Sequence, residues 1–257
     1  MTLKEKIKSG KKLIGTHINL NDVAVGRIAG LAGYDYVWID LEHSYLSLEN
    51  LMAHIIAVKS GGSSVIVRAP QDDFTFTKKI LEMGVDGIIF PMVKTAEQAK
   101  KLIDFTLYPP YGNRGFGPMG AVDFGFRDVA DYIEKSRDEI CRFIQIEHID
   151  TINNLDEIMK NEFIDGFVFG PYDLSGSINE LGKVFEDNTV NLIKDTVKKL
   201  KANSKTVALS TGDTSEEVFS LYESLGVDML SAGSDYGFLK NSFLNNRIML
   251  EKSFKKM

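Results

Sequence analysis

The sequence predicts an α/β fold, a (β/α)8 or TIM barrel that forms one domain over residues 1–257. Eight short apolar runs, rich in Val, Ile and aromatic residues, are spread along the chain, and stretches with helical periodicity fill the gaps between them. Four of these runs also share one local pattern. Strands and helices that alternate over about 250 residues are typical of a parallel barrel. A doubly wound open sheet is the alternative.

The shared pattern places an aspartate at the start of an expected strand. It occurs in "AGYDYVWID", "MGVDGIIFP", "EFIDGFVFG" and "LGVDMLSAG", where the aspartates are Asp35, Asp86, Asp165 and Asp228. In three of the four segments a glycine stands two residues before the aspartate, and Phe163 takes its place in the third. A helix closed by a glycine, followed by a tight turn and a buried strand, produces this pattern.

The other four expected strands lie at 13–18, 64–68, 141–147 and 206–210. No G-x-G-x-x-G motif follows an early strand, so a dinucleotide-binding domain is not indicated. The longest gap between strands contains the segment 107–126, which is rich in Gly, Pro and aromatic residues. We expect this segment to extend over the mouth of the barrel.

Helix starts are indicated by capping residues. Ser47 stands directly before the helical stretch "LENLMAHIIAVKS". Two pairs have the spacing of a capping box: Thr95 with Gln98, and Thr214 with Glu217.

Composition narrows the class of protein. The chain is 44% hydrophobic and 26% charged with a net charge of −6, which is globular composition and gives no support to nucleic-acid binding. No apolar run approaches the roughly 18–20 residues of a membrane span, and "MTLKEKIKSGKK" lacks the apolar core of a signal peptide. The only cysteine, Cys141, excludes an intrachain disulfide. We therefore expect a cytoplasmic protein without a membrane or nucleic-acid partner.

Titratable groups cluster where the expected strands end. In a parallel barrel, catalytic side chains lie at the C-terminal ends of the strands. The candidates at these ends are Asp40, Glu42, His43, Arg68, Gln145, Glu147, Gly170, Pro171, Tyr172 and Asp173. Residues far apart in the sequence are therefore expected to meet on one rim of the barrel.

This set suits metal-assisted acid–base chemistry. Glu147 and Asp173 offer hard oxygen ligands to Mg²⁺ or Mn²⁺, although carboxylates alone also leave Co²⁺ or Zn²⁺ open. Arg68 can donate two hydrogen bonds to a carboxylate or enolate oxygen. His43 can act as a base near neutral pH, with Asp40 or another carboxylate orienting it. The Gly-Pro turn before Asp173 could present backbone N–H groups to a small anion.

Other polar residues have simpler explanations. We expect His17 and His54 to be structural and His148 to point away from Glu147, because neighbours on a strand alternate. Arg114 can simply hold its own loop. Lys94 lies beyond a strand end, and no lysine stands convincingly on one, which argues against a Schiff-base aldolase.

Six motifs together resemble a known family. In order they are "WIDLEHSYL", "VIVRAP", "IIFPMVKTAEQAK", "YPPYGNRGFGP", "IQIE" and "GPYDLSGS". They resemble the metal-dependent (class II) pyruvate aldolases of the 2,4-dihydroxyhept-2-ene-1,7-dioate aldolase family, which also contains 2-dehydro-3-deoxyglucarate aldolases. The resemblance extends roughly over 13–237. It implies reversible aldol cleavage of a 2-oxo-4-hydroxy acid to pyruvate and an aldehyde, with one divalent metal ion.

The resemblance also implies roles for individual residues. Glu147 and Asp173 would bind the metal, His43 would be the base, acting through water, and Arg68 would hold the pyruvate enolate. The pyruvate site would be lined by Gln145, Gly170, Pro171, Tyr172 and Asp173.

Two positions depart from the family pattern. The family usually has Asp where this chain has Glu82, the implied partner of the catalytic histidine from its own or a neighbouring subunit. Some members have a Trp near the first strand, where this chain has "GTHINLND". The family also tends to form homohexamers in which the last helix packs on a neighbouring barrel, and "YGFLKNSFLNNRIML" is compatible with this.

Three other functions are open from the sequence. A citryl- or malyl-CoA type lyase would need a basic groove for a nucleotide. A phosphosugar enzyme would bind phosphate at "STGDT" and "SAGSDYG", after the seventh and eighth strands. A catalytically silent barrel would be expected to lack some of the strand-end residues, and here the set is intact.

Overall fold

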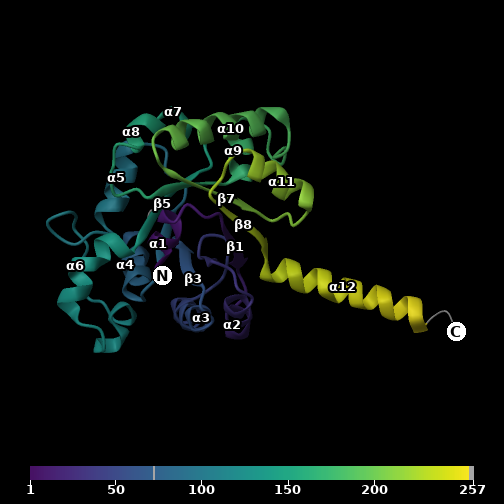
Figure 1. Cartoon of the computed structure of the whole chain (residues 1–257), viewed down its shortest axis with the longest axis horizontal. Helices are drawn as coiled ribbons and strands as arrows, with labels where there is room; N and C mark the ends of the chain where they lie inside the picture. The colour runs from purple at the N-terminus through teal and green to yellow at the C-terminus, as the bar shows by residue number, and fades with distance from the viewer. Residues whose placement is uncertain (72, 255–257) are drawn as a thin grey trace.

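A closed parallel barrel forms the core of the computed structural model, which describes residues 1–71 and 73–254 (Figure 1). Each strand pairs with its neighbours in chain order, and β1 also pairs with β8. This closure confirms the predicted barrel and excludes the open sheet. The strands are β1 Leu13–Ile18, β2 Tyr36–Asp40, β3 Ser64–Arg68, β4 Gly87–Phe90, β5 Cys141–Ile146, β6 Gly166–Phe169, β7 Thr206–Thr211 and β8 Met229–Ser234.

Helices connect the strands and cover the outside of most of the barrel (Figure 1). Their bounds are α1 Leu3–Lys8, α2 Val23–Leu31, α3 Leu48–Ser60, α4 Phe74–Glu82, α5 Ala96–Asp104, the 3₁₀ helix η1 Gly120–Gly125, α6 Val129–Glu139, α7 Ile149–Asn153, α8 Leu155–Ile158, α9 Pro171–Ser177, α10 Asp187–Ala202, α11 Glu216–Ser224 and α12 Asp235–Phe254. None of the helices in these described ranges is long and apolar enough to cross a lipid bilayer.

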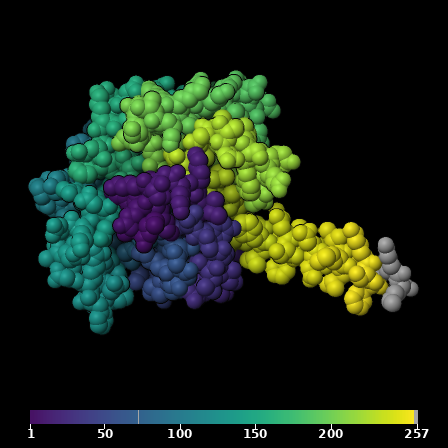
Figure 2. Space-filling view, in the orientation of Figure 1, coloured from purple at the N-terminus to yellow at the C-terminus, as the bar shows by residue number. Residues whose placement is uncertain are grey.

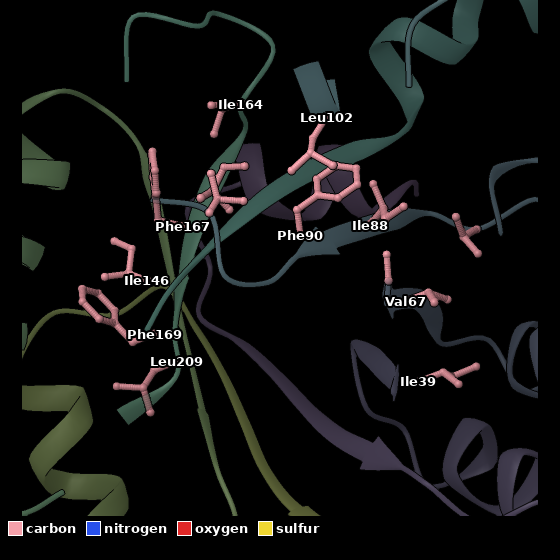
Figure 3. Packing of buried hydrophobic residues seen from close by; sticks show 14 of the residues in the cluster. Ile39, Val67, Ile88, Phe90, Leu102, Ile146, Ile164, Phe167, Phe169 and Leu209 are labelled. Carbon is pink, nitrogen blue, oxygen red and sulfur yellow. The ribbon is translucent and has the colours of Figure 1, made fainter. Parts of the chain in front are cut away.

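Strands β2 to β6 are buried on both faces, and alternate residues enter two separate cores. Trp38, Ile66 and Phe143 fill the interior of the barrel. Their sequence neighbours point outward into the layer between the sheet and the helices, where Figure 3 shows Phe90 next to Leu102 of α5. Burial on both faces explains why the strands read as continuous apolar runs.

The four repeated aspartates lie at the N-terminal rim, the end of the barrel where the strands begin. Each accepts a hydrogen bond from a backbone N–H at the start of the preceding strand. The donor–acceptor pairs are Ile14 with Asp35 at 3.0 Å, Val65 with Asp86 at 2.7 Å, Arg142 with Asp165 at 2.8 Å, and Val207 with Asp228 at 2.9 Å. The sequence repeat is thus a repeated structural contact.

The glycines of the repeat end their helices as predicted. Gly33, Gly84 and Gly226 have φ values of 86°, 86° and 85°, a left-handed conformation that residues with a Cβ rarely adopt. In the third segment α8 ends at Ile158, well before Phe163, so no glycine is needed there.

Two of the three predicted helix starts are confirmed. Ser47 caps α3, and Thr95 forms a capping box with Gln98 on α5. The Thr214 prediction is wrong, because α11 is capped at Ser215 and that cap has no side-chain hydrogen bond. The Asp213 carboxylate instead accepts the Ser215 N–H at 2.7 Å, which forms a turn and delays the helix by one residue.

The long segment 107–126 does not cover the mouth of the barrel, contrary to the sequence prediction. It follows α5, which has already returned the chain to the N-terminal rim. There the N–H of Met119 donates to the carbonyl of Glu82 at 3.2 Å, and Arg114 donates to the Tyr132 hydroxyl at 3.0 Å. Arg114 therefore does hold its loop, and this loop belongs to the end of the barrel opposite the predicted site.

The last helix, α12, departs from the barrel instead of covering it (Figures 1 and 2). Phe243, Met249 and Phe254 are among its many exposed apolar side chains. The outer surface of β8 and β1, where a covering helix is expected, holds an apolar groove of about 450 Å³ lined by residues that include Ile14, Phe219, Leu230 and Phe238. Ile14 on this surface is 55% exposed.

Candidate active site

The C-terminal rim, where the strands end, surrounds a cavity of about 560 Å³. Eight of the predicted site residues line it: Asp40, His43, Arg68, Gln145, Gly170, Pro171, Tyr172 and Asp173. The strands on which they stand are far apart in sequence, and only closure of the barrel brings them together. Glu147 follows β5 and hydrogen-bonds Gln145, one of the lining residues.

Arg68 is fixed at the centre of the rim by two carboxylates. Its Nε and Nη2 donate to Asp40 at 2.9 and 2.5 Å, and its Nη1 lies 3.0 Å from Glu42 Oε2. Trp38 lies beneath the guanidinium, with its ring centroid 5.5 Å from Cζ. Three of the five guanidinium N–H groups are engaged, so two remain for a substrate oxygen.

Asp40 contacts Arg68 and the backbone of the turn that follows β2. Besides Arg68, it accepts hydrogen bonds from the N–H groups of Glu42 and His43, at 2.9 and 3.3 Å. Burial raises the pKa of Asp40, but Arg68 outweighs burial and holds that pKa below its ordinary value. Asp40 thus positions Arg68 and the turn, and it contacts the His43 backbone.

His43 projects from that turn toward solvent, with 64% of its side chain exposed. Its Nε2 lies 3.7 Å from Glu42 Oε2. Burial raises the pKa of Glu42, while Arg68 and His43 oppose this effect. Glu42 therefore lies between the guanidinium of Arg68 and the imidazole of His43. Its position one residue before His43 in the sequence did not reveal these two contacts.

Glu147 is buried, with 2% exposure, and both of its oxygens are engaged. Oε1 accepts the backbone N–H of Met92 at 2.5 Å, and Oε2 accepts Gln145 Nε2 at 2.6 Å. The pKa of Glu147 is raised to about 7, mainly by burial and to a smaller extent by the nearby Glu42 carboxylate, while the hydrogen bond from the N–H of Met92 lowers it. A buried carboxylate beside other carboxylates is stabilised by a cation.

The glycine at the end of β6 keeps this corner open. A Cβ on Gly170 would lie 2.7 Å from Gln145 Nε2 and 3.2 Å from Glu147 Oε2, so a side chain there would displace both groups. Gly170 donates its own N–H to Ile146 at 3.1 Å, and Pro171 has none. Any backbone contact to an anion must therefore come from Tyr172 and Asp173, in the first turn of α9.

The donor set fits one hard divalent cation. Glu147 and Asp173 follow the adjacent strands β5 and β6, and the charge of Asp173 is one of the smaller causes of the raised pKa of Glu147. Within residues 1–71 and 73–254, no group of three or more His, Cys, Asp or Glu side chains is arranged to hold a metal ion. Two protein carboxylates leave the other positions to water and substrate oxygens, which is typical of Mg²⁺.

Glu82 lies far from this rim in its own chain. It is the last residue of α4, at the N-terminal rim, where Gly117 packs against its carboxylate. It does not line the cavity. The structure therefore does not bring Glu82 to His43 within one chain.

His17 contributes to the cavity, although the sequence suggested only a structural role. It stands at the end of β1 and lines the cavity with Ser210 of β7 and Gly233 of β8. Its position one residue before the end of an apolar run was the available signal. His54, in contrast, is buried under α2 and hydrogen-bonds Leu20 O at 2.9 Å, as expected of a structural residue.

The remaining candidates are structural. His148 caps α7 by accepting the N–H of Asp150 at 3.1 Å, which confirms that it is turned away from the site. Lys94 does not line the cavity, and its backbone N–H donates to Gln98 at 2.9 Å.

A closed parallel barrel with titratable side chains gathered on its C-terminal rim is typical of an enzyme. Comparison with known proteins agrees. Residues 13–236 match the HpcH/HpaI aldolase/citrate lyase family. The chain belongs to this family, and it is a carbon–carbon lyase of the aldolase type, as its sequence predicted.

Three individual similarities support the assignment. A hydroxypyruvate/pyruvate aldolase of Deinococcus radiodurans is 33% identical over 91% of this chain and 84% of its own length. A 2-keto-3-deoxy-L-rhamnonate aldolase of Escherichia coli K12 is 29% identical over 98% of this chain and 93% of its own length. The crystal structure of an HpcH/HpaI aldolase from Desulfitobacterium hafniense has a TM-score of 0.90 at 27% identity and covers 98% of this chain and 97% of its own. The family is dependent on a divalent metal ion.

Proposed function

We propose that this aldolase cleaves a 2-oxo-4-hydroxy acid to pyruvate and an aldehyde with Mg²⁺ or Mn²⁺ held by Glu147 and Asp173, and with Arg68 and His43 as its catalytic residues. The observation that carries the assignment of roles is the convergence of these four residues on one rim. When bound, the cation supplies Lewis-acid polarisation of the 2-oxo group.

The proton transfers follow from the positions of the side chains. His43 accepts the proton of the C4 hydroxyl, directly or through one water, and its exposed ring can exchange that proton with solvent. The C3–C4 bond breaks, C4 becomes the aldehyde carbon, and the electron pair remains in the pyruvate enolate. The two free N–H groups of Arg68 donate to the enolate oxygen. Transfer of the proton from His43 to C3, directly or by exchange through water, then yields pyruvate and returns the imidazole to its neutral form.

The test is a metal-dependence assay with purified enzyme. Pyruvate and a panel of aldehydes should condense in the presence of Mg²⁺ or Mn²⁺, and a chelator should abolish the reaction until metal is restored. Full activity after exhaustive removal of metal would contradict the proposed mechanism.

The alternatives from the sequence receive no support from the cavity. Among its described lining residues, Arg68 is the only Lys or Arg, and it is already paired. A CoA ester would need further cations for its phosphates. A phosphosugar would need free N–H groups near the eighth strand, where Asp235 accepts those of Asn19 and Leu20 at 3.0 and 2.9 Å.

The proposal includes a homo-oligomer in which α12 packs into the groove over β8 and β1 of another subunit. The groove is apolar, and the exposed side chains of α12 that match it include Phe243, Leu244 and Ile248. A hexamer is the expected state by family resemblance. A cytoplasmic location also belongs to the proposal, supported by the single, buried and unpaired Cys141.

In such an assembly, Glu82 of one subunit is proposed to orient His43 of another. Glu82→Gln should then slow turnover, and so should His43→Ala, while mixed oligomers of the two variants should regain part of the activity. Unmixed samples of each variant are the controls. If mixing restores nothing and Glu82→Gln leaves the rate untouched, Glu82 is not the partner, and Glu42 takes that role.

A further inference from the structure

One side of the cavity, formed by the ends of β7, β8 and β1, has no part in the proposed bond cleavage. It is lined by His17, Asn19, Ser210, Thr211 and Ser234. Glu147, Asp173 and Arg68 stand on the ends of β5, β6 and β3 and hold the pyruvate half of the substrate in the proposed function. The aldehyde half therefore extends toward the β7–β8–β1 side.

Hydrogen bonds fix the tautomer of His17 on this side. Its Nδ1 lies 2.6 Å from the carbonyl oxygen of Gly233, which can only accept, so Nδ1 carries the hydrogen. Its Nε2 lies 2.9 Å from Ser210 Oγ. Burial lowers the pKa of His17 and keeps the ring neutral, so Nε2 is an acceptor. Trp38 holds the ring in place, with 5.2 Å between the two centroids.

The direction of the second hydrogen bond determines what Ser210 can offer a substrate. Because Nε2 accepts, the Ser210 hydroxyl must donate its one hydrogen to His17. Only the lone pairs of Ser210 Oγ then face the cavity. A hydroxyl group of the substrate can donate to them, whereas a carboxylate or phosphate oxygen would be repelled.

The charges around this side also disfavour an anionic group on the substrate. The only Arg or Lys among the described lining residues is Arg68, which Asp40 and Glu42 already neutralise. Asp235, which is 6% exposed, occupies the backbone N–H groups of Asn19 and Leu20. An anionic tail on the aldehyde would find no cation here, and it would lie near an additional carboxylate.

We propose that His17 and Ser210 select an uncharged aldehyde with a hydroxyl group next to its carbonyl carbon, with Ser210 as the acceptor and His17 as the residue that positions it. The inference rests on the proposed function, because it concerns the acceptor of the same aldol reaction. It assigns recognition of the aldehyde to two residues, His17 at the end of β1 and Ser210 at the end of β7.

The experiment compares two aldehydes that differ by one hydroxyl group, glycolaldehyde and acetaldehyde. The kcat/KM of each is measured with pyruvate and Mg²⁺ and corrected for the unhydrated fraction of the aldehyde. The wild-type enzyme should prefer glycolaldehyde by about ten-fold, the effect of one hydrogen bond in a cavity. In Ser210→Ala this ratio should fall to about one. A wild-type ratio near one, or an unchanged ratio in Ser210→Ala, overturns the proposal.

The matched control is Ser231→Ala. Ser231 pairs with Ser210 across β7 and β8 but does not line the cavity, so its removal should leave the ratio at the wild-type value. An equal fall of the ratio in Ser231→Ala would overturn the role of Ser210.

A second variant tests the direction of the hydrogen bond. His17→Phe keeps a ring against Trp38 but removes the Nε2 acceptor, so the Ser210 hydroxyl becomes free to donate. The kcat/KM of succinic semialdehyde relative to butyraldehyde should then rise several-fold above the wild-type ratio. A ratio that stays the same or falls in the folded variant would show that His17 does not set the polarity of Ser210.

An assay without aldehyde separates this proposal from the proposed function. Metal-dependent exchange of deuterium into the pyruvate methyl group reports enolate formation alone. If no exchange occurs, both the proposed function and the inference that rests on it are wrong. If exchange proceeds but the aldehyde ratios are wrong, only the role of His17 and Ser210 is overturned.

Discussion

The two rims of the barrel both carry carboxylates, but they use them differently. At the N-terminal rim, Asp35, Asp86, Asp165 and Asp228 make the same contact four times, each with a strand-opening N–H at 2.7–3.0 Å. At the C-terminal rim no two carboxylates share an environment. Asp40 pairs with Arg68, Glu42 lies between Arg68 and His43, and Glu147 accepts from Met92 and Gln145.

This difference distinguishes the carboxylates with a structural role from those that we propose to act in the reaction. Three of the repeated aspartates, Asp86, Asp165 and Asp228, form ion pairs with lysines, and all four accept their backbone hydrogen bond without a ligand. Glu147 is ionised only at a cost, because burial raises its pKa to about 7. A contact that recurs along the barrel therefore indicates a structural role. A single carboxylate whose ionisation is unfavourable indicates a role in catalysis.

Glu147→Gln should have the largest effect, and its two consequences should be opposite in sign. Activity should fall on the order of a thousand-fold, because the proposed metal ligand is lost. The metal-free variant should be more stable than the metal-free wild type at pH 8. The raised pKa of Glu147 stabilises the wild type below about pH 4.5, and this contribution is lost as the pH rises through about 7.

The size of this stability difference can be measured by denaturant unfolding in chelator at pH 5 and pH 8. It should be on the order of 3 kcal/mol at pH 8 and close to zero at pH 5. Added Mg²⁺ should stabilise the wild type and not the variant. A variant that is destabilised at both pH values would mean that Glu147 serves the fold, like the aspartates of the other rim.

Arg68→Lys should have the next largest effect. The charge is kept, but the planar arrangement that pairs with Asp40 and Glu42 while it donates to an enolate is lost. We expect a decrease in kcat of about ten- to a thousand-fold, with an unchanged circular dichroism spectrum. An unchanged kcat would reduce Arg68 to a structural residue of the rim.

Asp86→Ala should show the smallest effect on activity and a clear effect on stability. The variant leaves the Val65 N–H without its 2.7 Å acceptor and removes the ion pair with Lys59. The free energy of unfolding should therefore fall by about 1–3 kcal/mol. The kcat per folded enzyme should stay within about two-fold of the wild type. A large loss of kcat at full folding would show that the two rims are not separable.

The sequence was sufficient for the features that local patterns encode. Apolar runs of the right length predicted all eight strands, and the Gly-x-Asp repeat predicted the turns before β2, β4 and β8. Titratable residues directly after these runs, such as Arg68 and Asp173, lie on one rim because parallel strands all end on the same side.

The features that were missed depend on which end of the barrel a segment reaches. The segment 107–126 follows a helix, so it lies at the N-terminal rim, although its composition resembles that of a binding loop. Glu82 ends a helix and lies on that same rim. His17 contacts Ser210, which is 193 residues away in sequence, and no local pattern can reveal such a pair.

The repeated aspartates have one more consequence, for the order in which the chain can assemble. Each joins residues only 21 to 23 positions apart, whereas the contact between His17 and Gly233, which accompanies the closure of β8 on β1, joins residues 216 apart. The longer loop costs about 2 kcal/mol more in chain entropy. The four short closures can therefore form independently as strand–helix–strand units, and they leave one costly step, the joining of the two ends of the sheet.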